Sequence, residues 1–176
     1  HSGMEVFISA GLEKCRNLFE ELPFAEIRIN AYMARFQMAE IVDLYVRTLR
    51  RLGFKLVQGS DGAGLGIDAS LTRGLLAIFG LKRFSRPQNT DRRSLAALRI
   101  MSTGFSAVYL ADRSVYAMAC SAMLRLTLRC GDSPWHAFSL VAYASSLTSS
   151  PGRLKGAVLL AGFALVSDRR NNIRFT

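Results

Sequence analysis

Residues 133–167 read SPWHAFSLVAYASSLTSSPGRLKGAVLLAGFALVS, and this stretch decides the fold class. Ser133 and Pro134 are typical of a helix start, because a serine hydroxyl accepts bonds from the free N–H groups of the first turn and proline needs no donor there. Apolar residues then recur every three or four positions, at Ala137, Leu140, Val141, Ala144 and Leu147. Residues 149–152 interrupt this spacing. The stretch therefore predicts two antiparallel helices joined by a tight turn.

The second helix of this predicted hairpin is rich in small residues. Its expected inner side carries Leu154, Ala157, Val158, Ala161, Ala164 and Leu165. Gly152, Ala157 and Ala164 have the spacing of the small residues in the second helix of a tetratricopeptide repeat, which let two helices pack closely. Ala161 stands where that motif has an aromatic residue. Both a helical-repeat array and a one-off helical bundle are compatible with this pattern, and we expect the repeat array.

In most of the remaining chain, apolar residues also recur with the period of an α-helix. Amphipathic patterns cover residues 6–22, 25–52, 68–79, about 92–105 and about 112–129. Pro23 is expected to end the first pattern, and Gly53 to form the C-cap of the second, which could divide into two helices at residues 36–38. The sequence thus predicts an all-α fold, with antiparallel helical hairpins in a tetratricopeptide-like helical-repeat array of about seven or eight helices.

Length and composition predict one domain. A chain of 176 residues with 50% hydrophobic content is large enough for a single core. Residues 1–3, which precede Met4, resemble the remnant of an expression tag, so the domain is taken as residues 4–176. The glycine-rich residues 58–67 are expected to form a linker. They lack the lysine and the preceding strand that a phosphate-binding loop needs.

The sequence also predicts the location of the chain. No signal peptide is recognisable, and the longest strongly apolar run, residues 157–166, is half as long as the roughly 20 residues that span a bilayer. We therefore expect a soluble cytoplasmic protein with no transmembrane segment.

Residue types that carry chemistry are sparse. Cys15, Cys120 and Cys130 are an odd number of cysteines with no CxxC pair, and His136 is the one nitrogen ligand near any of them. This is neither a disulfide framework nor a zinc site, and buried thiols in a reducing compartment are expected. His136 falls in the first turn of a helix, where capping or packing is its expected role. We therefore predict a non-enzyme with no catalytic, cofactor-binding or metal-binding residues.

The charge of the chain is unevenly distributed. Residues 1–60 carry eight Lys/Arg against seven Asp/Glu, a balance of +1, whereas residues 61–176 carry fifteen against six, a balance of +9. The excess could serve an anionic partner (nucleic acid, a phosphoinositide or an acidic protein segment) or form a solvated face. Candidate partner-contact residues are Arg83, Arg86, Arg92 and Arg93 in and beside a basic loop, and Leu159 on the last helix. Apolar surface around Leu159 predicts a weak homodimer through that helix.

Three segments carry a resemblance to a known family. They read TLRRLGFKL, RRSLAALRIM and LRLTLRCGDSPWHAFSLVAYASSL, and the matching positions are Leu52-Gly53, Arg92-Arg93 and Gly131-Asp132-Ser133-Pro134, with Asp132 in place of the family's asparagine. Over residues 38–166 the chain resembles the helical region of large multidomain signalling ATPases. These proteins join a protein-kinase-like domain or an AAA- or STAND-type NTPase domain to GAF and histidine-kinase domains. The glycine-rich linker departs from the proline-containing segment of that family.

The resemblance implies a function without implying any catalytic residue. It predicts a tetratricopeptide-like sensor or scaffold arm that sits beside an NTPase switch and passes partner or ligand binding to it. The expected function is thus a non-catalytic helical-repeat interaction module of a larger signalling protein, with no cofactor. Its partners would be protein segments or neighbouring domains of the same polypeptide. The alternative is a stand-alone basic helical module that binds nucleic acid or anionic lipid.

Overall fold

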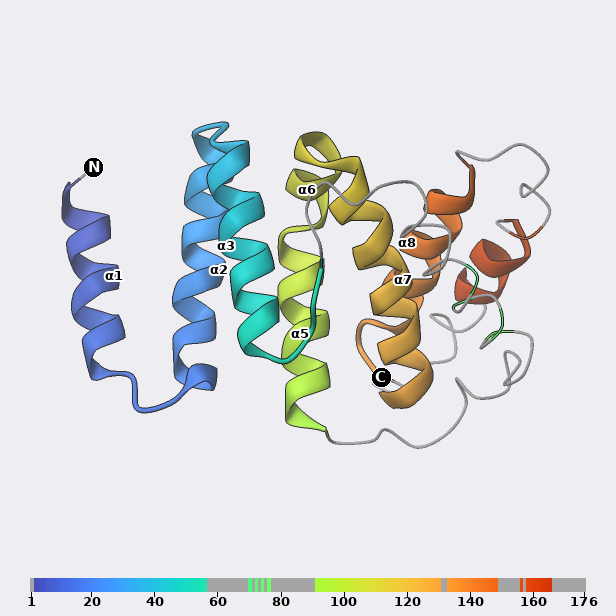
Figure 1. The fold of residues 1–176 in the computed structure, drawn as a ribbon, viewed down its shortest axis with the longest axis horizontal. Coiled ribbons are helices and arrows are strands. Elements are labelled where there is room, and N and C mark those ends of the chain that lie inside the picture. Colours follow the sequence, from blue (N-terminus) through green and yellow to red (C-terminus); the bar gives the residue numbers. More distant parts are fainter. Residues whose placement is uncertain are drawn as a thin grey trace. The chain divides into compact units, whose positions relative to one another are not determined.

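The computed structural model describes residues 2–56, 91–130, 133–148 and 158–165, together with residues 70, 72, 74, 76 and 156. All regular secondary structure in these ranges is helical (Figure 1), which confirms the all-α prediction. The helices are α1 (Ser2–Lys14), α2 (Leu18–Ala34), α3 (Met38–Arg51), α5 (Arg92–Thr103), α6 (Phe105–Ala111), α7 (Arg113–Cys130) and α8 (His136–Thr148). The predicted linker at 58–67 lies outside the described residues.

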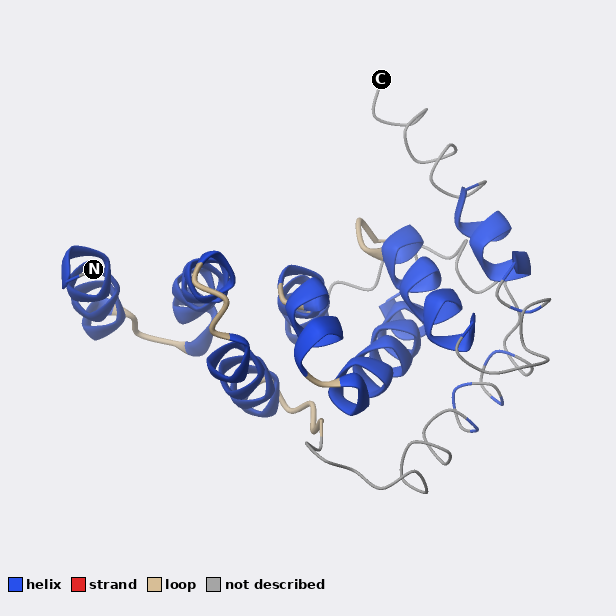
Figure 2. Ribbon diagram, turned by 90° about the horizontal axis from the view of Figure 1, so that it is seen from above, coloured by secondary structure: helices blue, strands red, loops and turns tan. Residues whose placement is uncertain are grey.

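The chain divides into two compact units, residues 1–58 with 92–115 and residues 59–91 with 116–176. In the first unit, α2 and α3 form an antiparallel hairpin, visible side-on in Figure 1 and end-on in Figure 2. Helix α1 packs on α2, α2 packs on α5, and α3 packs on both α5 and α6. A buried cluster of Ile29, Ile41, Leu44 and Ala107 joins the hairpin to α6. Apolar contact between the α2–α3 hairpin and α6 therefore helps to hold this unit together.

The boundary between α1 and α2 corrects the predicted helix over residues 6–22. The chain leaves the helix after Lys14 and begins α2 at Leu18, because Asn17 caps the new helix. The Asn17 carboxamide oxygen accepts bonds from the N–H groups of Phe19 and Glu20 at 3.0 and 3.2 Å, and the Glu20 carboxylate accepts one from the Arg16 N–H at 2.8 Å. This arrangement resembles a capping box, except that Glu20 accepts from the N–H of Arg16, one residue before the N-cap Asn17. Pro23 does not end a helix but lies inside α2.

The turn predicted at residues 36–38 exists, so the pattern over 25–52 forms two helices. Phe36 has a φ of 56°, a left-handed conformation usually taken by glycine, and its N–H bonds to the Met33 carbonyl at 3.1 Å. The predicted C-cap at Gly53 is also confirmed. Its φ is 96°, and its N–H bonds to the Arg50 carbonyl at 3.0 Å. Both helices therefore end in the left-handed residue that satisfies their last carbonyls.

A second break divides the helix predicted over residues 92–105. Helix α5 ends at Thr103 and α6 begins at Phe105, with a bend of 57° between them. Gly104 lets the bend pack closely on α3, since a Cβ atom there would lie 2.6 Å from Cδ2 of the buried Tyr45 ring. Among the described residues no single helix is long and apolar enough to cross a membrane, although the bent α5–α6 pair passes that test by length and composition.

Helix α7 begins within a residue of the prediction, because the Asp112 carboxylate accepts bonds from the N–H groups of Ser114 and Val115 at 2.9 and 3.0 Å. In the second unit, the hydroxyl groups of Tyr116 on α7 and Ser145 on α8 lie 2.7 Å apart. This hydrogen bond links the two helices.

The start of α8 lies two residues later than predicted. Helix α8 begins at His136, whose N–H bonds to the Ser133 carbonyl at 3.0 Å. The Ser133 hydroxyl, expected to cap the helix, is buried and finds no hydrogen-bond partner in the described part of the chain. Leu140, Ala144 and Leu147 face inward as expected, but Val141 is exposed. The side that packs against neighbouring elements includes Tyr143 instead.

The described part of the last predicted helix, residues 158–165, is helical. Leu160 and Ala164 are buried there, whereas Val158, Leu159 and Leu165 are 63%, 71% and 67% exposed. The inward positions predicted for Val158 and Leu165 are therefore wrong. The prediction that this helix leaves apolar surface uncovered is confirmed.

Candidate functional site

A hollow of about 260 Å³ opens in the first unit between α1, α2 and α3. Its apolar lining comes from Leu12, Leu18, Leu22, Phe24, Ala25 and Leu44. Its polar lining comes from Glu21, Arg28, Arg47, Thr48 and Arg51. Most of these residues recur every three or four positions on α2 or α3, so each helix turns one face toward the hollow. The site is therefore a product of helix packing.

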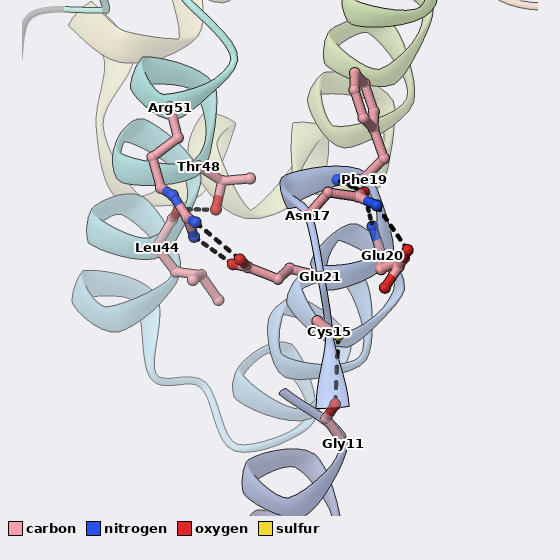
Figure 3. Close-up of polar contacts among 9 residues, drawn as sticks. All are labelled: Gly11, Cys15, Asn17, Phe19, Glu20, Glu21, Leu44, Thr48 and Arg51. Carbon is pink, nitrogen blue, oxygen red and sulfur yellow. Dashed lines mark hydrogen bonds and ion pairs between the residues drawn. The ribbon is translucent and has the colours of Figure 1, made fainter. Parts of the chain in front are cut away.

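Helix α1 closes one side of the hollow through a close approach at Gly11. A Cβ atom at this position would collide with the ring of Phe24. Glycine therefore lets α1 lie against α2 and brings Leu12 to the lining. The Cys15 thiol, one turn further on, donates a hydrogen bond to the Gly11 carbonyl at 3.3 Å (Figure 3).

Glu21 of α2 and Arg51 of α3 form an ion pair at the edge of the hollow. Figure 3 shows the two parallel contacts of this fork, from Nη1 to Oε2 and from Nη2 to Oε1, the latter 2.9 Å long. The hydrogen bond from Arg51 lowers the pKa of the Glu21 carboxyl, against the opposing effect of burial. The same bond raises the pKa of Arg51. Both oxygens of Glu21 are thus bound to one guanidinium, which fixes the geometry of this wall.

The other two arginines of the lining, Arg28 and Arg47, each have a single contact to a carboxylate in the described part of the chain. Nη2 of Arg28 lies 3.2 Å from Oε2 of Glu5, while Nε of Arg28 is buried with no acceptor among the described residues. Nη2 of Arg47 lies 3.1 Å from Oδ2 of Asp43, one turn back on α3, and the Arg47 side chain is 63% exposed. Water screens an ion pair of this kind, so it contributes a few tenths of a kcal/mol, roughly. Arg47 is therefore available to another anion.

The Thr48 hydroxyl donates a hydrogen bond to the Leu44 carbonyl, one turn back on α3, at 2.7 Å. The lining of the hollow therefore combines six apolar side chains with three arginines and one glutamate. Such a surface binds through apolar burial and charge. Within the described ranges, no group of three or more His, Cys, Asp or Glu residues could hold a metal ion.

The structure describes three of the five partner-contact residues predicted from sequence. Arg83 and Arg86 lie outside the described residues. Arg92 and Arg93 are exposed at the start of α5, and the Arg92 guanidinium stacks 4.3 Å above the centre of the Phe19 ring. Leu159 is exposed, as predicted. None of these three lines the hollow.

Sequence reasoning missed the hollow. Its only sequence signal is the recurrence of leucine and arginine at helical spacing on two neighbouring helices, which is also the pattern of a solvated helix face. The pairing of Glu21 with Arg51 joins residues thirty positions apart. Local sequence patterns do not reveal that contact.

The surroundings of the cysteines and of His136 indicate that these residues have a packing role. None of the three described cysteines forms a disulfide bond, Cys120 and Cys130 are buried, and burial raises the pKa of Cys120 to about 12. Burial, followed by the charges of Glu20 and Glu21, also raises the pKa of Cys15. These shifts disfavour the reactive thiolate. His136 is buried, and its ring centre lies 6.2 Å from that of Phe163.

No known protein family, no curated protein sequence and no solved structure matches this chain.

Proposed function

We propose that this chain is a non-catalytic protein-interaction module built from stacked helical hairpins in the manner of a tetratricopeptide array. The packing order of the first unit supports this architecture. The hairpin of α2 and α3 packs on the bent α5–α6 pair, with α2 against α5 and α3 against both α5 and α6. Helix pairs stacked in this way bury one face on their neighbours and leave another face for partners.

The hollow between α1, α2 and α3 is the observation that carries the interaction function. It offers an apolar lining bordered by arginines, which are enriched at protein interfaces. A partner would gain apolar burial and oriented charge there without any chemical step. In the larger signalling protein that the sequence resembles, such a site would sense a partner segment or a neighbouring domain.

A second interaction is favoured by the last helix. The exposed side chains of Val158, Leu159 and Leu165 form apolar surface within one short helical segment. Burying such surface against another copy of the chain would remove it from water. We propose weak self-association as a secondary property of the module.

Selection from a random peptide library tests the interaction function. The immobilised full chain is expected to enrich linear peptides that share a motif, whereas heat-denatured chain is not. Enriched peptides should bind the chain in solution by calorimetry, with a weak dependence on salt. No enrichment over the denatured control would contradict the proposal. Tight binding of DNA or anionic vesicles that falls steeply with salt would favour the alternative of a basic anion-binding module.

A further inference from the structure

We infer that the hollow between α1, α2 and α3 binds a linear protein segment in which an aliphatic side chain is flanked by carboxylates. The inference rests on the proposed interaction function and names the ligand class of the same site. Three features support it: the size of the hollow, the identity of its apolar lining and the arginine donors that an incoming carboxylate can bind.

The size and lining point to aliphatic side chains. A volume of about 260 Å³ lies just below the range of about 300–1,000 Å³ for pockets that enclose a small organic ligand. Four leucines and one phenylalanine supply most of the lining. A hollow of this size and character accommodates one or two apolar side chains presented by an extended or helical segment.

The arginines of the lining favour a segment with carboxylates. The lining carries three arginines, and each of them has one carboxylate partner: Glu5 for Arg28, Asp43 for Arg47 and Glu21 for Arg51. Glu21 adds little repulsion, because both of its oxygens are bound by Arg51. Arg47 can exchange the exposed Asp43 for an incoming carboxylate at small cost, and Arg28 retains a donor that no described acceptor satisfies. A segment with carboxylates therefore complements the donors of these two arginines, and a basic segment offers them no acceptor of that kind.

The same features disfavour nucleic acid as the occupant. A phosphate backbone would use the arginines but would leave the leucine-rich lining without a partner. Burial of an aliphatic side chain in that lining requires a protein segment. Binding of single-stranded nucleic acid is therefore treated as an outcome of the test.

The test measures the affinity of the full chain for three labelled peptides of equal length by fluorescence anisotropy. One peptide combines leucine with glutamate, the second leucine with lysine, and the third serine with glutamate. We expect the first to bind about tenfold or more tighter than the other two, since it alone supplies both the apolar and the charged contact. A labelled oligothymidylate of similar length is the nucleic-acid probe.

Two variants test the site, each with a matched control. Arg47→Glu reverses a lining charge, and Arg50→Glu makes the same change at an exposed position of α3 outside the hollow. Ala25→Leu fills the hollow without altering charge, and Ala39→Leu adds the same side chain at an exposed position. We expect the two lining variants to weaken the leucine–glutamate peptide about tenfold and the two controls less than about twofold. Circular dichroism checks that each variant keeps its helical content.

The outcomes separate this inference from the proposed function. Equal binding of the lysine peptide, tighter binding of the oligothymidylate, or equal losses in the lining and control variants would overturn the inference. So would the absence of binding by all three peptides. If the random library nevertheless enriches peptides without carboxylates, the interaction function stands and only the ligand class is wrong. If the library also yields nothing, both proposals fail.

Discussion

Replacing Gly104 by alanine tests how closely the stacked helices pack. Gly104 is buried at the bend between α5 and α6, and its φ of −87° and ψ of 2° suit any residue. The added Cβ atom would lie 2.6 Å from Cδ2 and 2.9 Å from Cε2 of Tyr45. Tyr45 is fully buried, and its hydroxyl lies 3.4 Å from the Met101 carbonyl oxygen, so its ring has little room to move away.

Two opposing effects determine the size of the change. Alanine reduces the freedom of the unfolded chain, which stabilises the fold by about 0.4–1 kcal/mol where the backbone accepts it. Overpacking a well-packed core destabilises it by about 1–3 kcal/mol. The steric effect is larger, so we expect a net loss of about 1–2 kcal/mol in the free energy of unfolding. For a chain of this length, that loss lowers the melting temperature by roughly 2–8 °C.

Urea unfolding followed by circular dichroism measures this change. Gly162→Ala is the control, because no atom lies within 4 Å of the Cβ position and the residue is exposed in a helix. That variant should be as stable as the parent or slightly more stable. Adding Tyr45→Leu to Gly104→Ala should recover part of the loss, which a double-mutant cycle detects as coupling. A Gly104→Ala variant as stable as the parent chain would refute the close packing of α3 against the α5–α6 bend.

Three further predictions concern the edge of the hollow, the thiols and the last helix. Glu21→Gln should lower stability at pH 7 by a few tenths of a kcal/mol. Arg51 lowers the pKa of Glu21 in the folded state. The stabilisation by this ion pair is therefore present above the ordinary glutamate pKa of about 4.3 and is lost as the pH falls through the lowered pKa of the folded state. The urea midpoints of the parent chain and the variant should accordingly converge in acid. A thiol reagent should modify Cys15 in the native chain and Cys120 only after unfolding; equal rates in the native state would contradict the burial of Cys120. Leu159→Glu should abolish any self-association seen by analytical ultracentrifugation while keeping the helical content, and a parent chain that stays monomeric at high concentration would disprove the proposed dimer.

Local patterns predicted the fold class because helical periodicity and helix ends are properties of nearby residues. Gly53 was correctly placed as a C-cap, since glycine reaches the left-handed conformation at low cost. The turn at Phe36 was also found, although a phenylalanine occupies its left-handed position. The helix start at Asn17 was not predicted, although Asn17 and Glu20 have the spacing of a capping box. The apolar period continues through these residues, and the end of the helix was therefore predicted at Pro23.

Tertiary contacts limited the rest of the prediction. The need for a glycine at position 104 comes from Tyr45, which is distant in sequence and packs beside it only after folding. Burial on α8 differed from the expectation for a related reason, since packing against neighbouring elements buries Tyr143 and leaves Val141 exposed, and helical period alone does not decide between the two. The hollow could not be predicted from the sequence either, because its lining comes from three helices and no short motif specifies how these helices pack together.

A titration of the full chain with the leucine–glutamate peptide, followed through the arginine Nε–H signals in heteronuclear NMR spectra, tests the central claim most directly. The account predicts saturable shifts at Arg47 and Arg51, whose side chains line the hollow, and none at Arg50, which lies outside it. Shifts confined to Arg50 and other arginines outside the hollow, or no shifts at saturating peptide, would contradict the claim that this hollow is the binding site.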